Sequence, residues 1–134
     1  MNQEEAKLQS YFFTEFGIRF PHIVAYAIPN GGFRNLKEAE RLKRMGVLKG
    51  VWDIFIAYPY SDFCGIYIEM KSQTGVLTPE QKEFRKNLCE RYMFSVLSSK
   101  EDIREFIIWL KKFAYFLDNF VKCCMLVIIQ VSKG

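Results

Sequence analysis

Three charged residues, Asp53, Glu69 and Lys71, stand inside two strongly apolar stretches of the sequence. A charged side chain in a buried strand is costly unless it is paired or bound to a metal ion. Two carboxylates supply the hard oxygen ligands that magnesium and manganese take, and the lysine adds a positive charge close to Glu69. Such a set suits hydrolysis of a phosphodiester bond, in which a metal ion activates water and neutralises charge on the phosphate. The competing interpretation is a buried ion pair between Lys71 and one of the acids, which an isolated Glu-x-Lys pattern would favour.

Each of the two apolar stretches has the composition of a β-strand, and the short turn between them predicts a hairpin. Because side chains alternate between the two faces of a strand, Glu69 and Lys71 share one face of the second strand. The same alternation groups Trp52 with the isoleucines of the first strand and places Asp53 on the opposite face. We therefore expect Asp53 and Glu69 to meet across the hairpin.

Helices and strands around the hairpin are predicted from the spacing of apolar residues and from turn-forming residues. In order, the predicted elements are a helix over 3–16 ended by Gly17, a strand over 22–28, a turn over 29–32, a helix over 36–45 ended by Gly46, the hairpin strands over 51–58 and 65–71, a helix from Thr78 to about Tyr92, a strand over 93–97 and a helix over 100–113 capped by Ser98 or Ser99. The third helix begins with Thr-Pro-Glu-Gln, which places Gln81 at the reciprocal position of a capping box.

The length and composition predict one folded domain rich in apolar and aromatic residues. Four cysteines without a CxxC pair, and a single histidine, argue against a zinc site. The polar, acidic N-terminus does not predict a signal peptide, so we expect reduced thiols in the cytoplasm. Residues 114–134 form an apolar extension to which the sequence assigns no role, and its uncharged part is too short to cross a bilayer.

Basic residues gather in one segment, 34–50, where six basic and two acidic residues account for the whole net charge of +4. The six basic residues are Arg34, Lys37, Arg41, Lys43, Arg44 and Lys49. A segment that carries all of the net charge is a candidate surface for the phosphates of DNA. Charge alone favours the plainer interpretation, a solvated helix face with side-chain pairs one turn apart.

Four motifs follow one another along the chain: EAKLQ at 5–9, PNGGFR at 29–34, KGVWD at 49–53 and IEMKSQTGVLTPEQ at 68–81. Together with the strand and helix after them, they resemble the VRR-NUC domain (virus-type replication-repair nuclease), a branch of the PD-(D/E)xK nuclease superfamily. The resemblance covers about residues 3–110, and we assign a VRR-NUC-like domain to residues 1–113. One departure is Trp52, which stands where the family usually has a proline that shapes the backbone and carries no chemistry.

The resemblance implies an α/β fold with a restriction-endonuclease-like core, in which a small mixed β-sheet is flanked by helices. It implies that Asp53 and Glu69 are metal ligands, together with the backbone carbonyl of Met70. It also implies that Lys71 is catalytic and that Gln81, at the start of the next helix, belongs to the site.

A glutamate on the first helix often completes this site in the family, as a further catalytic and metal-binding residue. Glu5 fits best because Gln9 follows one helical turn later, as in the family pattern, and Glu4 is the neighbouring alternative. The implied cofactor is Mg²⁺ or Mn²⁺.

The implied function is a metal-dependent endonuclease that cuts branched DNA such as four-way junctions. The implied assembly is a homodimer with no membrane partner, in the cytoplasm of a bacterial or phage-infected cell. One alternative is a general or restriction-like nicking nuclease of the same fold. A second is a non-catalytic DNA-binding module that keeps the charges as an ion pair, and the presence of all of Asp53, Glu69, Lys71 and Gln81 argues against it.

Overall fold

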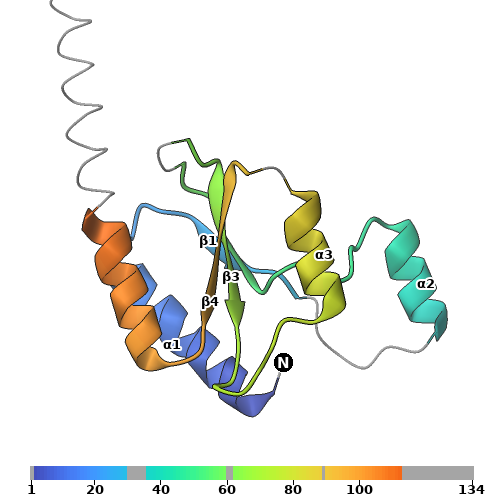
Figure 1. Cartoon of the computed structure of the whole chain (residues 1–134), viewed down its shortest axis with the longest axis horizontal. Helices are drawn as coiled ribbons and strands as arrows, with labels where there is room; N and C mark the ends of the chain where they lie inside the picture. Colours follow the sequence, from blue (N-terminus) through green and yellow to red (C-terminus); the bar gives the residue numbers. More distant parts are fainter. Residues whose placement is uncertain (1, 30–35, 60–61, 89, 113–134) are drawn as a thin grey trace, which may run out of the picture.

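A four-stranded mixed sheet forms the centre of the protein (Figure 1). The computed structural model describes residues 2–29, 36–59, 62–88 and 90–112. The strands lie in the order β1 (Ala25–Ala27), β2 (Ile54–Ile56), β3 (Gly65–Met70) and β4 (Tyr92–Leu97). β2 pairs antiparallel with both β1 and β3, whereas β4 runs parallel to β3. The predicted hairpin of β2 and β3 and the predicted mixed sheet are both confirmed.

Two helices cover one face of this sheet and build the main core. Helix α1 (Gln3–Arg19) lies beside the last described helix, residues 100–112, and the Phe12 and Phe106 rings meet with centroids 6.3 Å apart (Figure 1). Beneath them lie the isoleucines of β2 and β3, which are fully buried as the alternation predicted. Ser99 caps the second helix by accepting a hydrogen bond from the Asp102 amide, as one of the two predicted caps.

Helix α1 does not end at Gly17, as the sequence predicted, but continues to Arg19. A glycine inside a helix costs about 1 kcal/mol relative to alanine, which tertiary packing readily outweighs. The packing here is between Phe16 and Phe20, whose ring centroids are 5.0 Å apart in the core. An ion pair between Glu15 and Arg19 also supports the last turn.

Helix α3 (Pro79–Asn87) covers the opposite face of the sheet through a cluster of aromatic rings. Trp52 belongs to this cluster: its ring meets Phe94 edge-on, with centroids 4.9 Å apart, and its Nε1 donates to the Gln81 carbonyl. The prediction that Trp52 shares a face with the isoleucines is therefore wrong. The period of two applies only within an extended strand, and β2 begins at Ile54, two residues after the tryptophan.

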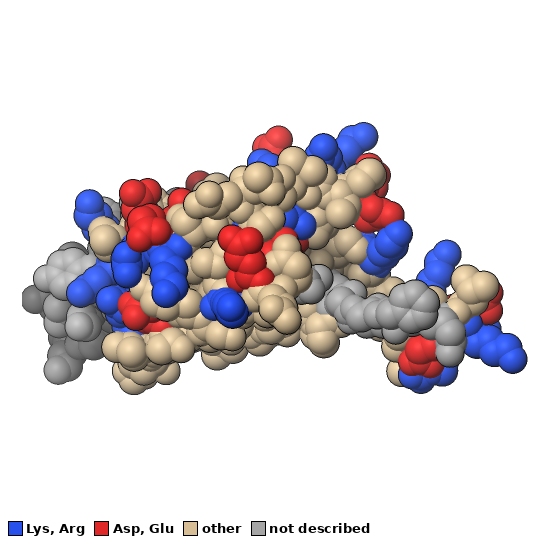
Figure 2. Space-filling view, turned by 90° about the horizontal axis from the view of Figure 1, so that it is seen from below, with Lys and Arg blue, Asp and Glu red and all other residues tan. Residues whose placement is uncertain are grey.

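Helix α2 (Leu36–Arg44) lies away from the rest of the molecule (Figure 1). No residue of this helix is buried. Its existence is confirmed, and Gly46, which has φ +88°, follows it in the left-handed conformation expected of a glycine after a helix. In the space-filling view, basic side chains project from this outlying end beside acidic ones (Figure 2).

Several predicted bounds were too wide. The strand predicted over 22–28 is limited to β1, the strand over 51–58 to β2, and α3 ends at Asn87 because the chain must turn before β4 begins at Tyr92. Among the described residues, no helix is long and apolar enough to cross a membrane. The predicted extension at 114–134 lies outside the described residues, so the domain division stays a prediction.

Candidate active site

The predicted catalytic residues line one pocket of about 580 Å³. They reach it from α1, from the segment before β2, from the end of β3 and from the first turn of α3: Glu5, Asp53, Glu69, Lys71 and Gln81. Residues separated by as many as 76 positions are thus brought together by the sheet and the helices on its two faces. The structure shows this juxtaposition, whereas the roles of the residues stay predictions.

The pairing of β2 with β3 positions the two central acids. Ile54 pairs with Ile68, so Asp53 and Glu69 are the next neighbours along the ladder. Asp53 Oδ2 accepts a hydrogen bond of 2.9 Å from the backbone N–H of Met70. The side chain of Met70 lies in the core, so this residue can offer only its backbone to the site.

Two side chains converge on the same oxygen of Glu69. Lys71 Nζ lies 2.9 Å from Glu69 Oε1, and the side-chain amide of Gln81 donates to that oxygen as well. The other oxygen, Oε2, is buried and has no hydrogen-bond partner among the described residues. Since Glu69 is only 2% exposed, water in bulk does not solvate it. The carboxylate is therefore fixed through one oxygen, while the second is left for another electropositive group.

Burial disfavours the charged form of both central acids. Burial, reinforced by the nearby negative charge of Asp53, raises the pKa of Glu69 to about 7 against the opposing effect of Lys71. Burial is also the main cause that raises the pKa of Asp53, against the hydrogen bond from Met70. A divalent cation between the two acids would supply the positive charge that one lysine does not.

The capping box of α3 sets the position of Gln81. The Thr78 side chain accepts from the Gln81 amide, and Gln81 Oε1 accepts from the Thr78 amide at 2.9 Å, as the sequence predicted. Because the cap holds the side-chain oxygen of Gln81, the side-chain nitrogen Nε2 points to Glu69 and donates to it. Gly50 allows the segment before β2 to approach this turn, because a Cβ there would lie 2.5 Å from the Glu80 backbone.

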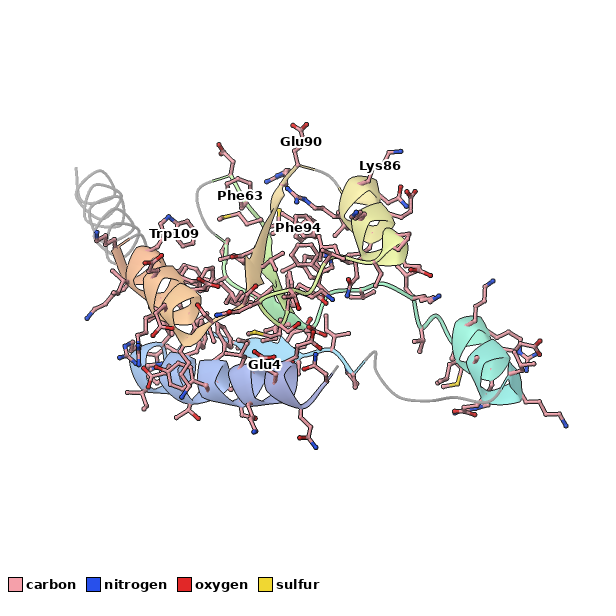
Figure 3. The ribbon with its side chains drawn as sticks, turned by 60° about the horizontal axis from the view of Figure 1, so that its bottom comes forward. Glu4, Phe63, Lys86, Glu90, Phe94 and Trp109 are labelled. Carbon is pink, nitrogen blue, oxygen red and sulfur yellow. The ribbon has the colours of Figure 1, made fainter. Side chains whose placement is uncertain are left out.

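The first turn of α1 brings Glu5 to the pocket. Glu5 forms a capping box with Asn2, and its Oε1 also accepts a 3.3 Å hydrogen bond from the Ser72 amide just beyond β3. Glu4, labelled in Figure 3, is exposed and does not line the pocket. Of the two alternatives, the structure thus places Glu5 near the other acids.

The donor set suits a magnesium-type cation better than a closed cage. No group of three histidine, cysteine or acidic side chains within the described part of the chain is arranged to hold a metal. Magnesium, however, keeps several waters and is bound through one or two carboxylates together with substrate phosphates. Asp53 and the unpartnered Oε2 of Glu69 provide such a pair of oxygens, so the residues present fit the predicted cation.

The predicted DNA-binding residues fall into three groups. Lys49 lines the pocket and pairs with Glu80. Arg34 lies outside the described residues. The four others are exposed on α2, where Arg41 forms a two-pronged contact with Glu38: Lys37, Arg41, Lys43 and Arg44.

Two further features had no role assigned from the sequence. Gln9, which the family pattern used only to select Glu5, lines the pocket one turn after it, and its place on the same helix face could have marked it as part of the site. A second hollow of about 390 Å³ lies along α3 and is lined by Lys82, Arg85, Lys86 and Glu90 together with Phe94 of β4 (Figure 3). These three lysine and arginine residues escaped notice because glutamates nearby in the sequence cancel most of their charge.

The chain resembles a solved structure described as a VRR_NUC domain protein. The two share 24% sequence identity, the match covers 84% of this chain and 89% of the other, and the TM-score is 0.63. The predicted resemblance and the predicted α/β fold with a restriction-endonuclease-like core are thereby confirmed at the level of the fold. Neither a protein-family model nor a curated protein sequence matches the chain.

Proposed function

We propose that this protein is a divalent-metal-dependent DNA endonuclease that hydrolyses phosphodiester bonds in the pocket around Glu69. The observation that carries the proposal is the state of this buried carboxylate. One oxygen is held by Lys71 and Gln81, the other is unpartnered within the described structure, and Asp53 lies beside it. A structural ion pair would need neither the second acid nor an open pocket. The fold shared with a VRR_NUC domain protein supports the same conclusion.

The residues of the pocket divide the work between binding and proton handling. A magnesium or manganese ion, held by Asp53 and Glu69 with the Met70 carbonyl and Glu5 close by, would polarise the scissile phosphate and activate water. Lys71 places its ammonium group where charge develops on the phosphate, or it orients the attacking water. Gln81 fixes the orientation of Glu69.

The basic residues supply affinity for the DNA backbone in this proposal. Lys49 lies at the pocket itself, and its pair with Glu80 is exposed enough for a phosphate to replace the carboxylate. The exposed side chains of α2 extend the positive surface away from the site. Contacts of this kind fix the position of DNA without reading its sequence.

Branched DNA is the proposed substrate and a homodimer the proposed assembly. Each chain has one such pocket within its described residues, so it makes one nick at a time, and a symmetric four-way junction needs two. Apolar side chains in and after α2 leave surface that a second protomer could cover: Leu36 is 84% exposed, Met45 66% and Leu48 59%. The cytoplasm of a bacterial or phage-infected cell is the expected setting.

Cleavage assays test the proposal directly. We expect the purified protein to cut a labelled four-way junction in Mg²⁺ or Mn²⁺ and not in EDTA, whereas Glu69→Gln binds the junction without cutting it. Flap, nicked and linear duplexes of matched length serve as comparison substrates, and light scattering at micromolar concentration gives the assembly. Equal nicking of linear and branched DNA by a monomer would favour a general nuclease. Binding of DNA without cleavage under any metal condition would favour a non-catalytic module.

A further inference from the structure

Gln9 has a buried amide oxygen that its surroundings do not satisfy. It lies on α1, one helical turn after Glu5, and lines the same pocket as Asp53, Glu69 and Lys71. Its Oε1 is buried and has no hydrogen-bond partner among the residues that the structure describes. Most buried polar atoms are hydrogen-bonded, so an unpartnered one indicates a missing water, ion or ligand.

Packing alone does not explain a glutamine at this position. The neighbouring positions that face the core are apolar, with Leu8 and Phe12 both buried. A methionine would fill nearly the same volume and would avoid the desolvation of an amide. The amide is therefore best explained by what lies in front of it, in the pocket.

The pocket contains a second unpartnered acceptor, Glu69 Oε2. These two acceptors, together with Asp53 just before β2 and Glu5 on the same helix as Gln9, place several oxygen atoms around one pocket. The two donors that reach Glu69, Lys71 and Gln81, both contact its other oxygen. The group that fits these oxygen atoms is a hydrated cation, which offers positive charge and water protons together.

We infer that Gln9 is a binding residue of the cation site and that its amide oxygen contacts the divalent cation or a water on that cation. This inference rests on the proposed function, because it assumes the cation that Asp53 and Glu69 would hold. It adds a neutral ligand from α1 to a set of acids, so the site gains an oxygen contact without a further negative charge. Removing a group that contacts a bound metal or its ligands commonly lowers metal affinity about 10-fold to 100-fold.

Metal binding and thermal unfolding of the wild type and four variants test this inference without an activity assay. Gln9→Met removes the amide at nearly constant volume, and Gln9→Glu keeps an acceptor while adding charge. Gln3→Met is the matched control, because Gln3 is exposed on the same helix. Glu69→Gln reports on the cation site itself. Each protein is titrated with Mn²⁺ by calorimetry and unfolded in EDTA and in Mn²⁺.

We expect Gln9→Met to bind Mn²⁺ about tenfold more weakly, yet to unfold in EDTA at least about 3 °C above the wild type, since an unsatisfied oxygen is gone. Gln9→Glu should unfold at a lower temperature in EDTA and gain more from Mn²⁺, whereas Gln3→Met should behave as the wild type. Wild-type Mn²⁺ affinity in both Gln9 variants, with binding lost in Glu69→Gln, would overturn the inference and leave the proposed function standing. Absence of Mn²⁺ binding by the wild type would overturn both.

Discussion

The pocket around Glu69 and helix α2 both attract attention through their charges, yet the fold treats those charges differently. Glu69 is 2% exposed, and the side chains that surround it come from α1, the segment before β2, β3 and α3. Helix α2 buries no residue, and its Arg41 pairs with Glu38 of the same helix. Water already solvates the charges of α2, so they specify little beyond their sign. A charge held inside a core must be compensated there, and the compensation reveals the chemistry.

Removing a charged group from the pocket should produce the largest effect of the substitutions considered, a loss of cleavage rate. Asp53→Asn, Glu69→Gln and Lys71→Ala should each lower the cleavage rate about a thousandfold, because each loses a metal ligand or the charge that stabilises the transition state. DNA affinity should stay near the wild-type value, since the groups that contact the backbone lie elsewhere. Single-turnover cleavage and filter binding on the same labelled junction measure the two quantities. Near-normal cutting by all three variants would show that the pocket is not the active site.

The pH dependence of the unfolding free energy should also distinguish the pocket from α2. The expected effect is smaller than the loss of cleavage rate. Folding raises the pKa of Glu69 from 4.5 to about 7, so the folded protein binds a proton more tightly than the unfolded chain. The metal-free protein should therefore lose about 3 kcal/mol of stability through Glu69 as pH rises from about 4.5 to 7, and this loss should be complete above that range. The raised pKa of Asp53 acts in the same direction.

Urea unfolding in EDTA between pH 4.5 and 8 measures this loss. Glu69→Gln should flatten the curve, and saturating Mn²⁺ at pH 8 should restore stability to the wild type. A variant with the α2 charges neutralised should keep the wild-type slope, because those side chains are exposed. A flat wild-type curve in EDTA would mean that Glu69 ionises freely and that the pocket is better solvated than its burial indicates.

The sequence was sufficient for those parts of the site that local rules determine. The hairpin register, which brings Asp53 to Glu69, follows from strand alternation and a short turn, and the capping box of α3 positions Gln81 through residues three apart. The single glutamate that lines the pocket from α1 followed from a family pattern rather than from physical chemistry. The hairpin register depends on one pair of strands, and the capping box depends on residues close together in the sequence.

The features that the sequence did not predict depend on contacts between distant elements. The continuation of α1 past Gly17 places Phe16 and Phe20 in the core shared with the sheet and the last described helix, and the place of Trp52 is explained by Phe94 and α3. The partner of Lys49 is Glu80, 31 residues away. Local propensity carries no information on such pairs. The outlying position of α2 could not be predicted either, because helical propensity predicts a helix whether or not another element covers it.

Neutralising α2 should affect DNA binding and little else. We expect a smaller slope of log Kd against log salt concentration, by about 0.9 per lost phosphate contact, when glutamine replaces four residues together. These residues are Lys37, Arg41, Lys43 and Arg44. Stability should change by less than about 0.5 kcal/mol, because the side chains are exposed. Filter binding across a salt series measures the slope. The control is the double variant Lys111→Gln and Lys112→Gln, which removes two exposed charges from the helix of residues 100–112. An unchanged slope in the α2 variant would show that α2 is a solvated helix without a role in DNA binding.

A small loss of stability, coupled to a modest loss of cleavage rate, is expected at Gln81, which joins the helix cap to the pocket. Gln81→Ala loses the bond to the Thr78 amide, at a cost of roughly 0.5–1 kcal/mol, and also frees Glu69 to turn away from its position beside Asp53. Thr78→Ala is the matched variant, because it removes the cap by a similar amount and leaves the Gln81 amide group in place. Both variants should therefore unfold at lower urea concentration, but only Gln81→Ala should cut more slowly, about tenfold, as expected when a ligand loses the group that orients it. Equal stability loss with wild-type cleavage in both would show that Gln81 serves the helix alone, and the boundary between the pocket and its supporting structure would then lie at Glu69.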